Sequence, residues 1–484
     1  MADNTTKFFK GISTQTIITL TMGVMEIVVF AIISRLLSKE DFGYYAAISG
    51  IIAIFLSISE AGLGSSIIQK KDASNTFVST AFTWSLIIGS VISIIVYILA
   101  PYLANIIADS KLTIPLRAMS ITILLNSIIS VGNGILYRKL SFKTVGLISI
   151  ISYFTASAVS IIMASMGLGL YAVIALPITN AITHSCFLFY FVNYPKLQIR
   201  RNETKEIVSF GGWLTLGVIF NNITHQLDKL LLPKWMSVET LGAYNRPAGF
   251  VSSISMRING IFDTVLFPML SDFQNDRSKV KEVFRMSVSL LNSFSIILAA
   301  VFFFNAHLII AIFFGEDWLD LIPVMQIISI SIIFNINGRL VDCFFRSLAY
   351  VKLGFYLRVL AAAITFGCIY VGASYDVQGV AMAIVTANIA NILVKLGFLS
   401  KKTEVSIWDI IYRMFVAWRP VTPILLIGIP FLIYGNGSIV NDIGFAILFS
   451  AIICIEFIFF PKFVGEIYYV RVYPIIKSII NKIL

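Results

Sequence analysis

The residues of this sequence with the most evident chemistry are arginines inside long apolar stretches. Arg246 and Arg257 are eleven residues apart, so on a helix of 3.6 residues per turn both lie on nearly the same face. A basic side chain at the bilayer centre costs about 2.5–3.5 kcal/mol on insertion scales unless it faces water, a partner or the bundle interior. Because a guanidinium donates paired hydrogen bonds and stays charged when partly desolvated, this stripe suits a phosphate-bearing ligand.

Two further stripes carry polar and charged side chains at helical spacing. One of them has the positions i, i+4, i+7 and i+11, and its members are Asn335, Arg339, Asp342 and Arg346. The other comprises Asn221, His225 and Asp228, with Lys229 next in the chain. We predict that these stripes share a wet, basic cavity, and its predicted substrate-binding residues are Arg257, Arg339, Arg246, Arg358 and Lys229.

Simpler roles are open for several of these charges. Long basic side chains near the ends of apolar stretches can extend to lipid headgroups, which applies to Arg246, Arg346, Arg358 and Lys395. Asp342 could also neutralise Arg339 by local pairing on one helix. Arg257 and Arg339 lie deeper in their stretches, so the functional role is favoured for these two.

Carboxylates in the apolar stretches suggest a coupling ion. Glu26 shares a helical face with Gln15 and Thr19, and Glu60 lies toward the end of the next stretch. A carboxylate there could bind H⁺ or Na⁺, or could pair with Arg117. The candidates for ion coupling or gating are Glu26, Glu60, Asp228, His225 and Asp342. The histidines and cysteines show no metal-ligand spacing, so we expect no metal and no other cofactor.

Two prolines mark candidate kinks in the stretch that carries the first stripe. Pro247 directly follows Arg246, and Pro268 lies near the far end of the same stretch. Proline removes a backbone donor and permits a bend, which a rocking transporter could use, although static bundles contain such bends too.

The elements that must position these groups are membrane-spanning helices. Of the 484 residues 58% are hydrophobic and 13% charged, and the mean hydropathy is +0.90, far from the usage of a soluble domain. Apolar stretches of about 18 residues or more, enough to cross about 30 Å of hydrocarbon, recur along the chain. The alternation of β-barrel strands does not appear, so helices must satisfy the backbone in lipid.

We therefore predict an all-α integral membrane protein with about 14 transmembrane helices. The predicted spans are residues 12–34, 42–68, 78–106, 114–136, 144–166, 169–193, 207–232, 240–270, 287–314, 321–347, 353–374, 377–399, 420–435 and 442–461. The first span is long and carries Glu26, which indicates an uncleaved helix and not a signal peptide.

The loop charges predict the orientation. With a cytoplasmic amino terminus, 23 of the 36 Lys and Arg residues fall in inner loops and tails and only four in outer loops. The positive-inside rule then places both termini in the cytoplasm. The net charge of +11 is dispersed among loops, so it indicates topology and not nucleic-acid binding.

An internal repeat predicts the domain organisation. SKEDFGYYA at 38–46 matches SVETLGAYN at 237–245 with a constant offset of 199, although chance similarity of two loops is an alternative. We predict two six-helix lobes of the same orientation with two extra helices after them. The predicted parts are an N-lobe (1–193), a cytoplasmic inter-lobe loop (194–206), a C-lobe (207–400), an interfacial segment with two helices (401–461) and a cytoplasmic tail (462–484).

Two long stretches carry a family resemblance. RLLSKEDFGYYAAISGIIAIFLSISEAGLGSSIIQKKD at 35–72 and LDKLLLPKWMSVETLGAYNRPAGFVSSISMRINGIFDTVLFPMLSDFQND at 227–276 resemble the Wzx-type flippases, especially the colanic-acid and teichuronic-acid exporters. These form the polysaccharide-transporter branch of the multidrug/oligosaccharidyl-lipid/polysaccharide superfamily. The similarity extends from about Phe9 to the fourteenth predicted span. Residues of this sequence that match the family's pattern are Asp228, Lys229, Gly242, Tyr244, Asn245, Arg246, Phe267, Pro268, Leu270 and Ser271.

The resemblance implies a V-shaped fold of two six-helix lobes around a basic lumen. It also implies alternating access that moves a polyprenyl-diphosphate-linked oligosaccharide from the inner to the outer leaflet of the bacterial cytoplasmic (inner) membrane. Pro247 departs from the family, where alanine typically follows the arginine, and this puts the local helix geometry in doubt.

Three functions are weighed, and the flippase is favoured. A cation-coupled multidrug antiporter of the same superfamily would favour an acidic cavity, whereas the charges found here are basic. A membrane glycan polymerase or ligase, an enzyme, needs a sizeable outer loop, and no predicted outer loop exceeds about a dozen residues. The expected partners are the lipid-linked oligosaccharide, membrane lipids and other glycan-assembly proteins, with no nucleic acid.

Overall fold

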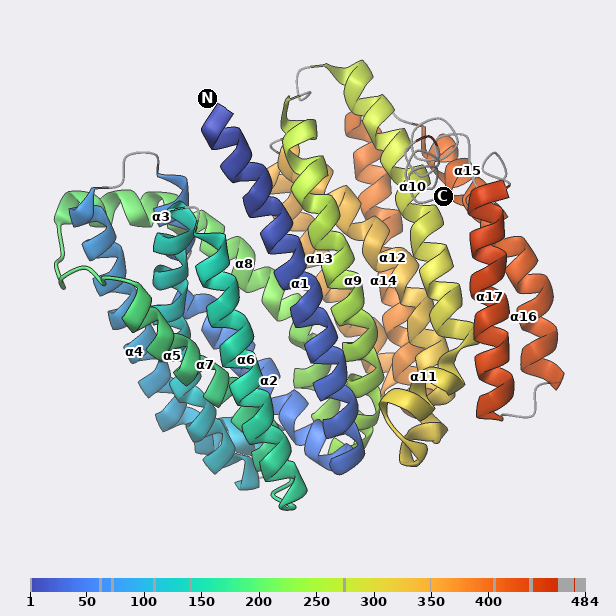
Figure 1. Cartoon of the computed structure of the whole chain (residues 1–484), viewed down its shortest axis with the longest axis horizontal. Helices are drawn as coiled ribbons and strands as arrows, with labels where there is room; N and C mark the ends of the chain where they lie inside the picture. The colour runs from blue at the N-terminus through green and yellow to red at the C-terminus, as the bar shows by residue number, and fades with distance from the viewer. Residues whose placement is uncertain are drawn as a thin grey trace. The chain divides into compact units, whose positions relative to one another are not determined.

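The computed structural model describes residues 2–60, 63–70, 74–107, 110–139, 141–272, 276–348, 350–403, 406–434, 438–459 and 474 (Figure 1). In these residues all regular structure is helical, which confirms the predicted all-α class. The predicted tail, 462–484, lies outside the described residues except for residue 474.

The helices follow one another along the chain with short connections. They are α1 (Ala2–Leu36), α2 (Lys39–Glu60), α3 (Leu63–Gln69), α4 (Asn75–Ile107), α5 (Thr113–Arg138), α6 (Phe142–Ser165), α7 (Leu170–Phe191), α8 (Arg201–Trp235), α9 (Val238–Asp272), α10 (Arg277–Phe304), α11 (Ala306–Phe313), α12 (Ile322–Ser347), α13 (Val351–Gly372), α14 (Val377–Thr403), α15 (Ile407–Val416), α16 (Thr422–Tyr434) and α17 (Ile439–Phe459). Three short 3₁₀ helices are Ser110–Leu112, Glu316–Leu321 and Arg419–Val421.

The chain forms two compact units, Met1–Asn245 and Arg246–Leu484. In the first unit α4 packs on α5, α6 on α7, and α8 on α2 and α4. In the second unit α12 packs between α10 and α14, and α10 also contacts α15. The boundary falls inside α9, beyond the predicted inter-lobe loop 194–206, because α8 packs against helices of the first unit. The predicted lobe limits stay predictions.

Twelve segments of the described residues are long and apolar enough to cross a membrane, as expected of a multi-pass membrane protein. They overlap twelve of the fourteen predicted spans. The other two predicted spans, 207–232 and 240–270, lie in α8 and α9, which have 35 residues each. At 1.5 Å per residue each helix is about 50 Å long, enough to cross, but neither is among the segments that are apolar enough to cross a membrane. The total of 14 therefore stays a prediction.

Several predicted spans are interrupted in ways that periodicity does not reveal. The predicted span 42–68 divides into α2 and the short α3. The predicted span 287–314 divides into α10 and α11 at Asn305, whose side chain donates to the carbonyl of Val301 at 2.8 Å. By contrast, α9 remains helical through Pro247 and Pro268, so neither proline ends it. Kinks at these prolines stay predictions.

Candidate functional site

The two copies of the repeat start their second helix with the same side-chain cap. At the start of α2 the backbone N–H and the hydroxyl of Ser38 donate to Asp41 Oδ2 at 3.1 and 2.7 Å, and the Asp41 N–H donates to Ser38 Oγ at 3.2 Å. At the start of α9 the Thr240 N–H donates to Ser237 Oγ at 3.1 Å, and the two hydroxyls lie 2.8 Å apart. A serine thus caps both helices at equivalent positions of the repeat, and the α2 cap also has the reciprocal bond of a capping box.

The two copies also touch each other through equivalent glycines. A Cβ added to Gly43 of α2 would overlap the carbonyl oxygen of Val238, and a Cβ added to Gly242 of α9 would overlap the carbonyl oxygen of Lys39. Lys39 and Val238 are themselves equivalent at the offset of 199. The contact is therefore reciprocal, and it brings two backbones together as only glycine permits. All four residues belong to the first unit.

Asp228 and Tyr244 hold the α8–α9 hairpin together. The Tyr244 hydroxyl donates to Asp228 Oδ2 at 3.2 Å, and the backbone N–H of Lys229 donates to Asp228 Oδ1 at 2.9 Å. Tyr244 is buried, with 3% of its surface exposed. A Cβ on Gly50 of α2 would lie only 3.1 Å from the Lys229 Cβ, so this glycine lets the lysine stem pass close to α2. Asp228, a candidate for coupling, is therefore fixed by Tyr244 and by the backbone of Lys229, a candidate for substrate binding.

The predicted basic stripe of α9 lies on one face of a continuous helix. Arg246 and Arg257 are half-buried, as is Ser253 between them. On the opposite side of the helix Val251 and Ser255 are buried. The exposed positions of α9, Gly249, Ser252 and Met256, lie to one side of the stripe, so the stripe borders the exposed face of the helix.

The stripe of α12 has the same character. Asn335, Arg339 and Asp342 are half-buried and Arg346 is exposed, while the residues between them form the packed face of the helix. Asp342 Oδ2 accepts from Lys395 Nζ of α14 at 2.9 Å. The ion pair of Asp342 is thus with Lys395 and not, as the local-pairing alternative supposed, with Arg339. Among the described residues no ion pair is recorded for Arg339.

The other predicted site residues lie on separate helices. Glu26 on α1, Glu60 at the end of α2 and Arg358 on α13 are half-buried, and His225 on α8 is exposed. The side chains of Asn221 and Pro268 lie outside the described ones. Within the described part of the chain no group of three or more His, Cys, Asp or Glu side chains could hold a metal ion. Their site roles stay predictions.

A polar network that the sequence did not predict binds residues 198–204, which precede the second copy of the repeat, to α4. We call residues 194–206 the joining segment. The N–H groups of Gln198 and Arg200 donate to Thr83 Oγ1 and Thr80 Oγ1 at 2.9 and 3.3 Å. The Trp84 indole donates to Thr204 Oγ1 at 3.0 Å. Thr83 and Trp84 lie one helical turn after Thr80, so the three side chains form one polar face of α4 that binds residues 198–204.

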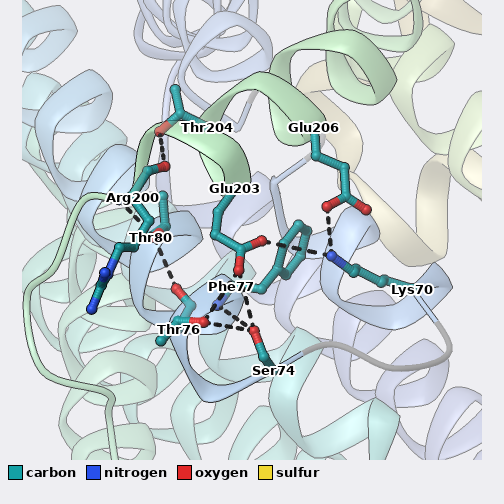
Figure 2. A network of polar contacts seen from close by, with 9 residues as sticks. All are labelled: Lys70, Ser74, Thr76, Phe77, Thr80, Arg200, Glu203, Thr204 and Glu206. Carbon is teal, nitrogen blue, oxygen red and sulfur yellow. Dashed lines mark hydrogen bonds and ion pairs between the residues drawn. The ribbon is translucent and has the colours of Figure 1, made fainter.

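The start of α8 extends this network (Figure 2). Lys70 Nζ lies 2.6 Å from Glu206 Oε2, 3.7 Å from Glu203 Oε2 and 4.1 Å from the centre of the Phe77 ring. Glu203 Oε1 also accepts from Thr76 at 3.2 Å and from Ser74 at 3.4 Å. Residues 201–206, predicted as loop, are thus the first turns of α8, fixed to the α3–α4 region.

Apolar contacts also hold the start of α8 and the chain before it in place. Ile207 is buried in a cluster with Leu63, Ile67 and Phe77. The Tyr194 hydroxyl donates to the carbonyl of Ile128 at 3.2 Å, and burial raises the pKa of Tyr194 well above its usual value. The only advance signal in the sequence is the pair of glutamates three residues apart that opens α8.

Known proteins are similar to this chain over most of its length. Residues 32–323 match the model of a family described as polysaccharide biosynthesis protein. The lipopolysaccharide biosynthesis protein WzxC of Escherichia coli (strain K12) is 23% identical over 74% of this chain and 73% of its own length. The teichuronic acid biosynthesis protein TuaB of Bacillus subtilis (strain 168) is 23% identical over 70% and 71%. The succinoglycan biosynthesis transport protein ExoT of Rhizobium meliloti (strain 1021) is 21% identical over 84% and 82%.

Solved structures show the same fold. The lipid II flippase MurJ in an inward closed conformation aligns with a TM-score of 0.70 at 15% identity, covering 92% of this chain and 98% of that one. An inward-facing multidrug resistance transporter of the MATE family, in the MOP superfamily, aligns with a TM-score of 0.67 at 14% identity, covering 78% and 94%. The helices therefore have the arrangement of MOP-superfamily transporters.

Proposed function

Because this chain belongs to the polysaccharide biosynthesis protein family, we propose that it moves a polyprenyl-diphosphate-linked oligosaccharide across the bacterial inner membrane. At the coarser level, it is a multi-pass membrane transport protein of polysaccharide biosynthesis and not an enzyme. The cargo, the mechanism and the placement of both termini in the cytoplasm are our proposals.

The observation that carries the proposed cargo is the placement of three half-buried arginines on helices of the second unit. Arg246 and Arg257 share one face of α9, at the border of its exposed side, and Arg339 lies on the less buried face of α12. Asp342, the acid nearest in sequence to Arg339, pairs with Lys395. An unpaired diphosphate in hydrocarbon would carry a prohibitive desolvation cost. A hydrated path lined by guanidiniums lowers that cost, while the prenyl tail can stay in lipid.

The proposed mechanism is alternating access, in which the reciprocal glycine contact forms and separates as the protein changes conformation. Gly43 and Gly242 bring α2 and the start of α9 into direct backbone contact. Such a contact has no interlocked side chains that must unpack when it separates. Coupling to H⁺ or Na⁺ through Glu26, Glu60, Asp228, His225 or Asp342 forms part of the same proposal.

The direct test is export of surface glycan by a deletion strain that carries variants of this chain. We expect the Arg257→Gln/Arg339→Gln double variant to lose export by roughly tenfold or more and to accumulate lipid-linked oligosaccharide on the inner leaflet. Lys352→Gln, which removes an exposed charge at the start of α13, is the control and should export normally. Membrane insertion is checked for each variant by quantitative blotting.

Two outcomes would count against the proposal. Full export by the double arginine variant would remove the basic path. A deletion strain with intact surface glycan but increased sensitivity to cationic drugs would favour the multidrug antiporter instead.

A further inference from the structure

The short helix α15 (Ile407–Val416) lies between the predicted spans of α14 and α16. The backbone turns at Ala417 and Trp418, and a 3₁₀ helix begins at Arg419, so α15 does not continue into α16. In Figure 1, α15 lies at the end of α16 where α16 begins. Residues 377–401 and 407–432 are long and apolar enough to cross a membrane, and α15 forms the start of the second of these segments, so it lies at one end of a crossing segment.

Three aromatic side chains occupy one face of α15. Trp408, Tyr412 and Phe415 follow one another at i, i+4 and i+7, and their exposed fractions are 75%, 64% and 74%. On the other side of the helix Ile410 is buried, with 1% exposed. The aromatic face therefore points away from the rest of the described chain.

The opposite face of α15 is bound to α10. Asp409 Oδ2 accepts from Arg285 Nε at 2.6 Å, and Asp409 Oδ1 accepts from Arg413 Nε at 3.2 Å. The Asn292 side chain donates to the carbonyl of Met414 at 2.9 Å, which satisfies a carbonyl in the last turn of the helix. These contacts fix the rotation of α15 and so fix the direction of its aromatic face.

We propose that α15 docks this aromatic face into the headgroup region of the lipid bilayer. Trp and Tyr combine an apolar ring with a polar group, which suits the boundary between headgroups and acyl chains. A short helix with one aromatic face and one polar face lies in the plane of that boundary. The neighbouring positive charges, Lys401, Lys402, Arg413 and Arg419, outnumber Glu404 and Asp409, which suits the anionic headgroups of a phospholipid surface.

The contacts continue from α15 into the second unit. Asn292, which binds Met414, also accepts from the Asn337 side chain at 3.0 Å. Asn337 lies on α12, two residues before Arg339. A lipid-bound α15 thus holds α10 and α12 at a set depth in the membrane.

The test is quenching of tryptophan emission in nanodiscs whose phospholipids carry bromine either close to the headgroup or deep in the acyl chain. Full-length native protein, Trp408→Phe and Trp318→Phe are compared. Trp318, with 2% exposed, is the matched control. We expect shallow bromine to quench the Trp408 contribution, obtained by difference, at least about twofold more than deep bromine. The Trp318 contribution should change little with either label.

Three results would overturn the inference. Iodide in the water could quench Trp408 strongly with no effect of brominated lipid, which would place the face in water. Quenching by neither agent would show that a protein covers the face. Stronger quenching by deep bromine would place α15 inside the bilayer as part of a span.

Discussion

The α1–α2 and α8–α9 junctions share their backbone geometry but not their side-chain chemistry. Both begin their second helix with a serine cap, and each places a glycine against the first turn of the other's second helix. At the offset of 199, however, Asp228 and Lys229 correspond to Val29 and Phe30. The copies thus agree where backbone must approach backbone.

The difference continues along the second helix of each copy. Arg246 and Arg257 of α9 correspond to Ala47 and Ile58 of α2. Ala47 is fully buried, whereas both arginines are half-buried. The two copies share helix starts and close contacts, whereas the four charges at positions 228, 229, 246 and 257 occur in the second copy only. This separation suggests that framework and chemistry can be perturbed independently.

The largest expected effect comes from disrupting the glycine contact that the two copies share. In Gly242→Ala the new methyl overlaps the Lys39 carbonyl, so α2 and α9 must separate, at a cost of about 1–3 kcal/mol and most of the export activity. Gly249→Ala, in the same helix with open space around the Cβ, should be neutral or slightly stabilising. Thermal stability in detergent and glycan export measure both. Equal behaviour of the two variants would show that the glycine contact has no special role.

The next largest effect concerns the Tyr244–Asp228 hydrogen bond, because the first copy has valine in place of Asp228. Tyr244→Phe leaves the Asp228 carboxylate without its hydrogen-bond donor, with an expected loss of about 1–3 kcal/mol of stability. Adding Asp228→Val, the residue type of the first copy, removes the stranded acceptor. We therefore expect the double variant to unfold at a higher temperature than Tyr244→Phe alone. A double variant less stable than either single one would contradict this account.

A smaller effect is expected in the segment that joins the copies. Lys70→Met removes both ion pairs and the contact with Phe77, and we expect a loss of about 0–1 kcal/mol at low salt that shrinks at high salt. Glu206→Gln removes only the more exposed pair and should cost less than Lys70→Met. Melting temperatures at two salt concentrations test this, and a salt-independent loss would indicate packing instead of charge.

The smallest effect separates two further helix caps by their response to pH. The α4 cap is Ser74, which accepts from the Phe77 N–H at 3.1 Å, and the α10 cap is Asp276, which accepts from the Lys279 N–H at 3.1 Å. Hydrogen bonds from Lys279 lower the pKa of Asp276. Its contribution is therefore complete above the unfolded value of about 3.9 and is lost as pH falls through the lower folded value.

Melting temperatures between about pH 3 and pH 6 measure this contribution. Asp276→Asn should keep a cap and lose this part of the acid sensitivity, whereas the Ser74 cap has no titrating group of its own. An unchanged pH profile in Asp276→Asn would show that the cap makes no such contribution.

Contacts within one helix were predictable from the sequence, and contacts between distant helices were not. Spacing alone placed Arg246 and Arg257, and also Arg339 and Asp342, on common faces, and the helices have those faces. Spacing could not reveal that Asp342 pairs with Lys395, because that partner lies 53 residues away on another helix. The bonds from Lys70 to Glu206, 136 residues apart, were missed for the same reason.

The number and ends of the membrane spans were also only partly predictable from the sequence. Hydropathy located twelve membrane-crossing segments but cannot decide for α8 and α9, whose charges lower it. It also missed the breaks after Glu60 and at Asn305, because a break of one or two residues hardly changes the average hydropathy of a window.

Several bonds hold the joining segment closely against α4. Gln198, Arg200 and Thr204 are each tied to α4, and Glu203 and Glu206 are tied to Lys70. A nick in the peptide chain between Tyr194 and Gln198 would leave all of these ties in place. The protein should therefore reassemble from two co-expressed fragments divided there, whereas a bulky insertion after Arg200 should not be tolerated.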